Sequence, residues 1–393
     1  MKIKMYPAKN GDSFLVAADG VNILIDGGYA VTFQTHIRAD LLDITKRGER
    51  LDLLVATHID ADHIGGLITF IAANGPSSNP AVVTVSEIWH NSLRSLTAKN
   101  AAVIDAPDLA LLSGINRRGM PLQQPGASSA QEISASQGSS LARLLHQGGY
   151  KWNGADGSSC IRKACGAWRL GPTAAVRMLG PDPQRLENLQ LWWEAELCRM
   201  GYAGATGSDA VIDDAFEFLC AHGRPPVEPP RTISSGGGNT LQDVYVPDSS
   251  VTNASSIIAV IEMGGCRALF LGDAWAEDVL RAVNELKAQG ESLTFDAIKV
   301  SHHGSLRNTS VELLDAVDAP VFFISSDGTR HGHPDFEVLA AIVDRPSAFR
   351  RKLYLNYESA ASERLQRHVS RGGATFTVEV GVTDWIELGA SHA

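Results

Sequence analysis

Short apolar runs separated by turn residues fill the first ninety positions of the chain. The segments MKIKMY, SFLVAA and VNILIDGG have the pattern of β-strands, and Asp19-Gly20 marks a hairpin turn between the second and the third. Apolar residues at helical spacing predict helices over residues 33–46 and in HIGGLITFIAAN. Between and after these helices the pattern predicts strands in LDLLVATH and AVVTVSEIWHN.

A second regular region begins near residue 253. It predicts strands in SSIIAVIEM, CRALFLGD, FDAIKVSHHGS and PVFFISS, with helices in WAEDVLRAVNELKAQ, SVELLDAVD and PDFEVLAAIV. Three further strands, KLYLNY, ATFTVEV and DWIEL, close the chain. Because hairpins outnumber βαβ units, the pattern favours a layered α/β sandwich over a doubly wound sheet.

The pattern is weaker between residues 92 and 252, and we interpret this region as an insertion within a single domain that spans residues 1–393. The insertion has a basic part (91–180), a helical part (184–222) and a Gly/Pro-rich loop (223–240). Trp192 and Trp193, together with the nearby Leu189 and Leu197, are spaced as on one face of a helix. We expect this pair to belong to the core of the insertion rather than to a platform for stacking bases.

Charge adds a local asymmetry to this picture. The chain has 34 basic and 44 acidic residues, a net charge of −10, which argues against indiscriminate binding of polyanions. The basic part of the insertion, in contrast, has ten lysines and arginines against four acids. This part is either an ordinary solvated face or, if it borders the active site, a surface that attracts a phosphodiester.

The sequence also bears on location and redox state. The N-terminus shows no secretory signal, and no apolar run approaches the roughly 20 residues that a bilayer span requires, so we expect a cytoplasmic protein with no membrane partner. The five cysteines form no CxxC pair, which fits reduced thiols and gives no zinc-finger pattern.

The segment ATHIDADHIGG places four potential metal ligands directly after an apolar strand. His58, Asp60 and Asp62 alternate along the segment, and His63 follows at the turn. Imidazole and carboxylate groups bind divalent cations, so the pattern indicates a metal site. The alternative is structural, because Asp residues at a helix start also serve as N-caps and first-turn acids.

Similar side chains follow other predicted strands, which favours the metal site. Asp26 follows the apolar residues of ILIDGG, Asp273 follows those of LFLGDA, and the pair His302-His303 follows those of IKVSHH. The segment RHGHP places His331 and His333 before a helix. Because such strand ends carry functional groups in α/β proteins, we expect these side chains to converge. His90, in EIWHNS, either lines the same cleft or is an ordinary polar residue near the surface.

Together, the motifs NGDSFLV, ILIDGG, THIDADHIGG, NASSIIAVIEMGGCRALFLGDA, SHHGSLRNTS and ISSDGTRHGHP resemble those of the metallo-β-lactamase superfamily. The subfamily they resemble most is the hydrolase domain of the ComEC DNA-uptake proteins and its stand-alone relatives. These motifs cover residues 1–70 and about 253–340. The resemblance implies a four-layer αββα sandwich, here with helical and loop insertions.

The resemblance also implies roles for individual residues. His58 and Asp60 match ligands of a first metal ion, and Asp62 and His63 match ligands of a second. Asp273 matches the carboxylate that bridges the two ions. Further matches are His302 as the remaining ligand of the second ion, His303 as its neighbour or substitute, Asp26 as a support of the metal loop, and His333 as a group that contacts the scissile phosphate or protonates the leaving oxygen.

Two positions depart from the common superfamily pattern. Asp60 stands where histidine is usual, although ComEC-like members share this change. Asn253 stands where the third histidine of the first site is expected, and its carbonyl oxygen is a weaker ligand. We therefore expect two divalent ions, Zn or Mn with Mg possible, of which the first is held more loosely.

The favoured hypothesis is a dinuclear phosphodiesterase or nuclease in which a hydroxide bridging the metals attacks phosphorus, so that nucleic acid or another phosphodiester is the substrate. A second hypothesis is a hydrolase of a small phosphoester or lactone. A third, from another class, is a metal-stabilised, non-catalytic subunit of a multiprotein system. In that case the insertion 92–252 would bind a protein partner.

Overall fold

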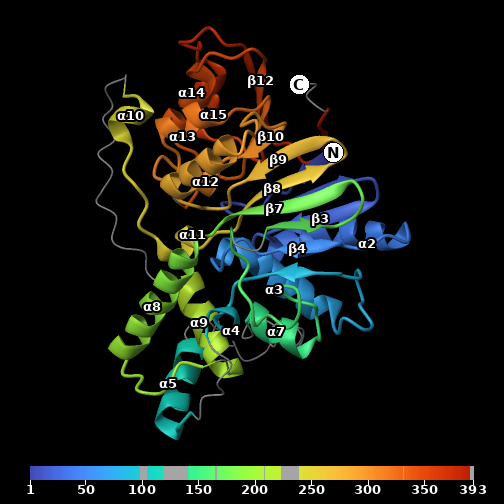
Figure 1. The fold of residues 1–393 in the computed structure, drawn as a ribbon, viewed down its shortest axis with the longest axis vertical. Helices are drawn as coiled ribbons and strands as arrows, with labels where there is room; N and C mark the ends of the chain where they lie inside the picture. Colours follow the sequence, from blue (N-terminus) through green and yellow to red (C-terminus); the bar gives the residue numbers. More distant parts are fainter. Residues whose placement is uncertain are drawn as a thin grey trace, which may run out of the picture. The chain divides into compact units, whose positions relative to one another are not determined.

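The structure is a computed structural model that describes residues 1–97, 104–117, 140–163, 166–207, 209–222, 239–330 and 332–389 (Figure 1). Most of the Gly/Pro-rich loop, part of the basic segment, Cys165 and His331 lie outside the described residues. The chain divides into two compact units. Unit 1 comprises Met1–Asn22, Arg162–Asp182 and Arg224–Ala393, and unit 2 comprises Ile23–Ile161 and Pro183–Gly223.

Two sheets and their helices confirm the predicted α/β class. One sheet has the strand order β14-β1-β2-β3-β4-β5, and the other has the order β13-β12-β11-β10-β9-β8-β7-β6. The second sheet lies in unit 1 and is antiparallel from β6 to β9 and parallel from β9 to β13. Its strands are β6 (Ala167–Arg169), β7 (Ala174–Gly180), β8 (Ile258–Met263), β9 (Cys266–Phe270), β10 (Ala297–Lys299), β11 (Val321–Ile324), β12 (Arg351–Leu355) and β13 (Phe376–Val380).

Amphipathic helices cover one face of this eight-stranded sheet. They are α12 (Ala276–Ala288), α13 (Val311–Ala316), α14 (Phe336–Asp344) and α15 (Ala360–Gln366), which group together in Figure 1. Val283 of α12 and Ile342 of α14 belong to the same buried cluster as Phe322 of β11. The core of unit 1 therefore forms between these helices and the sheet, because each element buries its apolar side against the other. Two shorter helices of unit 1, α10 (Leu241–Val244) and α11 (Val251–Ala254), precede β8.

The chain termini supply a second layer to unit 1. Strand β1 (Lys2–Met5) pairs antiparallel with both β2 (Phe14–Ala18) and β14 (Ile386–Glu387). The ring of Phe14 lies edge-on to Phe270 of β9 at 5.6 Å between centroids and to Phe323 of β11 at 6.0 Å. These contacts place β2 against a face of the eight-stranded sheet, which is the sheet-on-sheet packing expected of a sandwich.

Unit 2 contains the parallel strands β3 (Val21–Ile25, apart from its first two residues), β4 (Leu53–Val55) and β5 (Ile88–Trp89). Helix α3 (Ala61–Asn74) follows β4, as predicted from HIGGLITFIAAN. The predicted helix over 33–46 is observed as a π-helical turn η1 (Phe33–Ile37) continued by α2 (Arg38–Lys46), after a short α1 (Ala30–Thr32). Gly66 allows α3 to approach the chain closely, because a Cβ atom at this position would lie 1.9 Å from the carbonyl oxygen of Gly27.

The predicted strand AVVTVSEIWHN is wrong over most of its length. Only Ile88 and Trp89 join a strand ladder, and Val85 makes an isolated bridge to Leu51. Leu51 exchanges backbone hydrogen bonds with Thr84 and Ser86, and the N–H of Leu54 donates to the carbonyl of Glu87, so this segment follows residues 51–55 with an interrupted ladder. The β-branched composition indicated a strand but could not show where the ladder is interrupted.

The helical part of the insertion is confirmed as α8 (Pro183–Arg199) and α9 (Ala210–His222). Trp193 is fully buried and lies edge-on to Phe216 of α9 at 5.3 Å, as expected for a core residue, whereas Trp192 is only partly buried and does not belong to the core. The basic part contains α4 (Leu93–Leu96), α5 (Ala106–Arg117) and α7 (Leu141–Gln147), all in unit 2.

The single-domain boundaries stay a prediction. Among the described residues, no helix combines the length and the apolar composition that crossing a membrane requires.

Candidate metal centre

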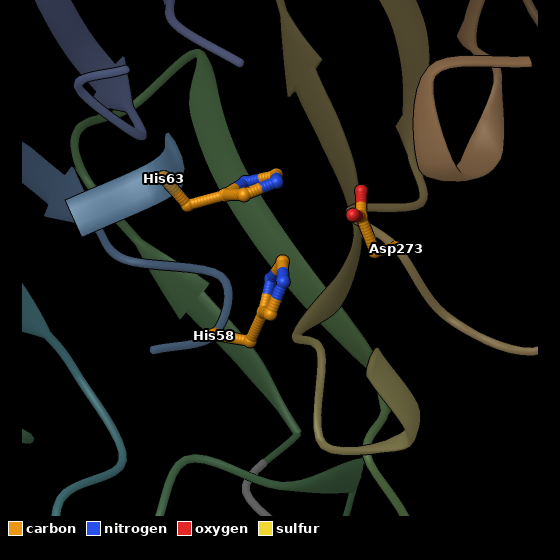
Figure 2. A group of neighbouring side chains, drawn as sticks. All are labelled: His58, His63 and Asp273. Carbon is orange, nitrogen blue, oxygen red and sulfur yellow. The ribbon is translucent and has the colours of Figure 1, made fainter. Parts of the chain in front are cut away.

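Unit 2 carries the first group of predicted ligands on the loop between β4 and α3. His58 lies on this loop and His63 lies in the first turn of α3, with their ring centroids 4.1 Å apart (Figure 2). Both side chains are buried. The Nε2 atom of His58 lies 3.8 Å from Oδ2 of Asp60, whose side chain is 29% exposed. Asp62 follows in the same first turn and is partly buried.

Asp26 fixes this loop through its two carboxylate oxygens. Oδ1 accepts a hydrogen bond from the backbone N–H of Thr57 at 2.8 Å, and Oδ2 accepts from the Thr57 hydroxyl at 2.7 Å. Oδ2 also lies 2.8 Å from Nδ1 of His63, which donates to it. Asp26 therefore supports the loop and the histidine from behind, as the resemblance implied.

These hydrogen bonds determine which ring nitrogens can accept. Thr57 donates its single hydroxyl hydrogen to Asp26, so its oxygen accepts from Nδ1 of His58 at 3.2 Å. His63 likewise uses its Nδ1 hydrogen for Asp26. In a neutral imidazole the other nitrogen, Nε2, then carries the lone pair. Both rings are thus held in the tautomer that a metal-binding histidine uses when Nε2 is the ligand atom.

The alternative to metal binding, that Asp60 caps helix α3 with its side chain, is not observed. Asp60 occupies the N-cap position of α3, but no hydrogen bond joins its carboxylate to the helix N–H groups. Its backbone carbonyl instead accepts from the N–H groups of His63 and Ile64. An N-cap aspartate normally stabilises its helix through the side chain. The backbone of Asp60 therefore takes part in the helix start, whereas its side chain does not cap the helix.

Unit 1 carries the second group of ligands, after strands β9 and β10. Figure 2 shows Asp273 on the loop that follows β9. Ligand atoms of Asp12, Asp273 and His303, all buried, lie within 4.8 Å of one another. His303 donates its Nδ1 hydrogen to the carbonyl oxygen of Ser325 at 2.9 Å, and its Nε2 lies 3.5 Å from Oδ2 of Asp273. Burial lowers the pKa of His303, but the carboxylates of Asp273 and Asp12 outweigh it and leave the pKa raised.

A buried lysine joins two of these carboxylates. The ammonium group of Lys299, which is 2% exposed, forms an ion pair with Asp12 and lies 3.6 Å from Oδ1 of Asp273. It also donates a hydrogen bond to the carbonyl oxygen of Gly272 at 2.8 Å. Neither Lys299 nor Asp12 was predicted as a site residue. Lys299 stands inside an apolar strand, and Asp12 precedes the predicted strand SFLVAA, whereas the other candidates follow their strands.

The neighbouring His302 has a different environment. Its Nδ1 lies 2.7 Å from Oδ1 of Asn308, and its Nε2 lies 3.8 Å from Oδ2 of Asp273. His302 and His303 both have left-handed backbones, with φ of 44° and 57°. Such a conformation is costly for residues other than glycine, and here it turns both rings toward Asp273. From the sequence alone it could not be decided which of these two adjacent histidines is the metal ligand.

Asn253 and His333 lie in the same unit. The amide nitrogen of Asn253 donates to Oδ2 of Asp248 at 2.8 Å, an interaction that the sequence did not indicate. His333 is buried, and its Nδ1 lies 3.1 Å from Oδ2 of Asp335. Burial lowers the pKa of His333 to about 4, although the bond to Asp335 opposes this shift. At pH 7 its imidazole is therefore neutral, so the condition for protonating a leaving oxygen, a pKa near neutrality, is not met in the structure.

His90 neither lies at the surface nor belongs to the groups described above. Its buried ring stacks on Trp152 at 5.9 Å and donates from Nε2 to Oε1 of Glu217 at 2.7 Å. Glu217 also accepts from the backbone N–H groups of Leu141 at 2.6 Å and Ala142 at 3.0 Å, at the start of α7. This glutamate thus links α9, α7 and the end of β5, a pairing across 127 positions that no local pattern indicates.

Asp213, on the same helix α9, gives a testable prediction about stability. Burial, together with the nearby carboxylates of Glu217 and Asp214, raises its pKa from 3.8 to about 8. Between these two pH values the folded state holds a proton that the unfolded state has lost, so stability falls as the pH rises from about 4 to about 8. We expect Asp213→Asn to remove this loss and to stabilise the protein at pH 8 by roughly 2–4 kcal/mol.

Urea unfolding at pH 5 and pH 8 measures this effect. The gain from Asp213→Asn should be larger at pH 8 than at pH 5, whereas the exposed control Asp43→Asn should change little at either pH. An equal effect at both pH values would show that Asp213 is ionised throughout this range.

The comparisons with known proteins agree with part of this picture. Residues 6–116 match the family model described as the Metallo-beta-lactamase superfamily. The match includes the β4–α3 loop with His58 and His63, and it ends well before Asp273. The α/β sandwich class predicted from the sequence is thus confirmed, whereas the likeness to ComEC-type proteins stays a prediction. No curated protein matches the chain.

Two solved structures are similar over nearly the whole chain. Zn(2+)-bound PqqB from Methylobacterium extorquens has a TM-score of 0.36 and 12% sequence identity, and the alignment covers 99% of this chain and 100% of PqqB. A protein named "Putative metal-dependent hydrolase" from Parabacteroides distasonis ATCC 8503 has a TM-score of 0.34 and 8% identity, with coverages of 96% and 92%. Scores of this size do not establish a shared fold, so neither likeness adds to the assignment.

Proposed function

We propose that this protein is a metal-dependent hydrolase that binds two divalent cations and cleaves phosphodiesters, with nucleic acid as the favoured substrate class. The observation that carries the proposal is the orientation of its histidines. His58, His63 and His303 each use Nδ1 for a hydrogen bond to the protein, which leaves Nε2 as the lone-pair nitrogen. Buried imidazoles in this tautomer, next to carboxylates, suit Zn or Mn, with Mg possible.

The proposed ligands come from both groups. By the resemblance, His58 and Asp60, with Asn253 as a weak third ligand, would hold the first cation, and Asp62 and His63 would hold the second. Asp273 would supply a carboxylate to both cations. We take His303 as the remaining ligand of the second cation, because it lies in the compact group with Asp273 and because the carboxylates that raise its pKa would equally attract a cation.

The chemistry follows from these donors. Two cations held there would lower the pKa of a water molecule and polarise the scissile phosphoryl group. Asp26, through Thr57 and His63, keeps the ligand loop in place, and Lys299 keeps Asp12 and Asp273 in place. His333, neutral at pH 7, has Nδ1 bonded to Asp335 and can accept a hydrogen bond at Nε2. The basic segment 91–180 adds little support for a phosphodiester substrate, because five of its described basic side chains form ion pairs within the protein: Arg94, Arg143, Lys151, Lys163 and Arg177.

Assays on purified protein test the proposal. The protein is supplied with Mn, Mg or Zn and offered single-stranded DNA, double-stranded DNA, RNA and bis(p-nitrophenyl) phosphate. The variants Asp62→Ala and His63→Ala are measured beside the wild type, with exposed Asp43→Asn as a control. Metal-dependent cleavage of a polymer by the wild type and by the control, lost in the two alanine variants, supports the proposal.

Other outcomes favour the other hypotheses. Activity on small esters alone would favour a hydrolase of a small phosphoester or lactone. Metal binding without any turnover would favour a non-catalytic subunit, with the insertion 92–252 as a surface for a protein partner. Asn253 favours this last hypothesis only because its carbonyl oxygen is a weak ligand, since its hydrogen bond to Asp248 uses the amide nitrogen and leaves that oxygen as an acceptor.

A further inference from the structure

A hydrogen-bonded chain in unit 1 leads from a carboxylate to His302. Oδ2 of Asp248 accepts from Nδ2 of Asn308 at 3.0 Å and from Nδ2 of Asn253 at 2.8 Å. The same Nδ2 group of Asn308 lies 3.0 Å from the carbonyl oxygen of Asp273. Asn308 is fully buried, so its amide has little freedom to turn. With two acceptors around its nitrogen, the orientation of the amide is determined by its partners.

This orientation determines the protonation of His302. Because the nitrogen of Asn308 faces Asp248 and the Asp273 carbonyl, its oxygen Oδ1 must be the atom that lies 2.7 Å from Nδ1 of His302. A carbonyl oxygen only accepts, so Nδ1 of His302 carries the hydrogen, because this contact is much shorter than the 3.4 Å between the same Nδ1 and Nδ2 of Asn253. Nε2 then carries the lone pair, and it lies 3.8 Å from Oδ2 of Asp273. The left-handed backbone at His302 helps to hold the ring in this direction.

We propose that Asp248 and Asn308 are positioning residues that hold His302 in the Nδ1–H tautomer and leave Nε2, on the side of the ring toward the Asp273 carboxylate, as the nitrogen with the lone pair. This inference rests on the proposed hydrolytic site and adds to it a function for His302, the first histidine of the SHHGS motif. The side chain of His302 is 21% exposed, against 3% for His303, so His302 is the histidine that water and substrate can reach. In the proposed site, Nε2 of His302 would accept a hydrogen bond from a water molecule, and His303 would be the ligand of the cation.

The tautomer is measured directly by ¹⁵N NMR of histidine-labelled full-length protein without added metal. The His302 signals are assigned by their absence in His302→Gln. We expect the wild type to show a protonated Nδ1 and a bare Nε2 at this residue. In Asn308→Ala the bond to Nδ1 is absent, and we expect the Nε2–H form to become the major one. Asn308→Asp retains an acceptor oxygen and should restore the Nδ1–H form.

Matched variants keep the test decisive. Asn284→Ala on the exposed face of α12 is the control for an asparagine lost elsewhere in the unit, and it should leave the His302 signals unchanged. If Asn308→Ala does not fold, the isosteric Asp248→Asn replaces it, because it weakens the acceptor that orients the Asn308 amide. We expect this variant to populate both tautomers.

Kinetics provide a second measurement. We expect Asn308→Ala to lower kcat by about 10–100-fold, the range found when a partner that orients an active-site ligand is removed. If Asn308 acts through His302, the double variant with His302→Gln should lose no more than His302→Gln alone. Additive losses would overturn the inference, as would a wild type with Nε2–H or a tautomer unchanged in Asn308→Ala. If the wild type cleaves nothing, the proposed function fails, and the NMR result still decides the position of the His302 proton.

Discussion

Asp273→Asn should abolish most of the hydrolytic activity and reduce the number of bound divalent cations, while the protein stays folded. The substitution keeps the size of the side chain and removes the charge that would bridge two cations. Loss of a partner that only orients a ligand costs about 10–100-fold, so we expect the loss of the bridging carboxylate to exceed about 100-fold in kcat/KM. Rate assays and metal analysis by mass spectrometry of the purified variant measure the two effects.

Asp315→Asn, which changes an exposed aspartate of the same unit, is the control for this prediction. It should retain wild-type activity and metal content. Wild-type metal content in Asp273→Asn would contradict the assigned role of the carboxylate, even if activity fell, because the loss would then concern a step after cation binding.

Lys299→Met should lower the free energy of unfolding by about 3–5 kcal/mol, the range observed when one partner of a buried ion pair is removed. Methionine fills a similar volume, so the main change is electrostatic. Asp12 and Asp273, which are 2% and 3% exposed, would lose the ammonium group that balances their charge. The hydrogen bond to the carbonyl of Gly272 would be lost as well. Guanidinium unfolding followed by tryptophan fluorescence measures the change.

Lys287→Met, at an exposed position of α12, is the matched control and should shift the free energy of unfolding by less than about 0.5 kcal/mol. A comparably small shift for Lys299→Met would mean that the two carboxylates are neutral or solvated without the lysine. A partial recovery of stability on adding Zn or Mn to Lys299→Met would agree with a cation site at the same carboxylates.

Much of the fold followed from local patterns in the sequence. The apolar run before His58 and the two glycines after His63 were enough to predict a strand, a loop and a helix, which are observed as β4, its following loop and α3. Helical periodicity likewise predicted α8, α9 and α12. These predictions held because each element buries one regular face, and this leaves a period in the sequence.

Other features of the structure leave no local pattern in the sequence. Lys299 stands in an apolar strand, and only the folded chain shows that Asp12, 287 positions earlier, lies beside it. The pairing of His90 with Glu217 is equally distant in sequence. His302 and His303 are two consecutive left-handed residues, and no local pattern predicts this conformation outside glycine, so their different environments could not be anticipated. Long-range ion pairs and unusual backbone conformations therefore account for most of what the sequence did not reveal about the site.

The central claim is that histidines and carboxylates from separate strand ends bind a pair of divalent cations. Anomalous diffraction from crystals grown with Zn or Mn tests it most directly, because the signal locates each cation and its ligands. The proposal predicts two anomalous peaks within coordination distance of Asp273, one of them at Nε2 of His58 and the other at Nε2 of His63. Strong peaks elsewhere with none at these side chains, in crystals that contain bound metal, would contradict it.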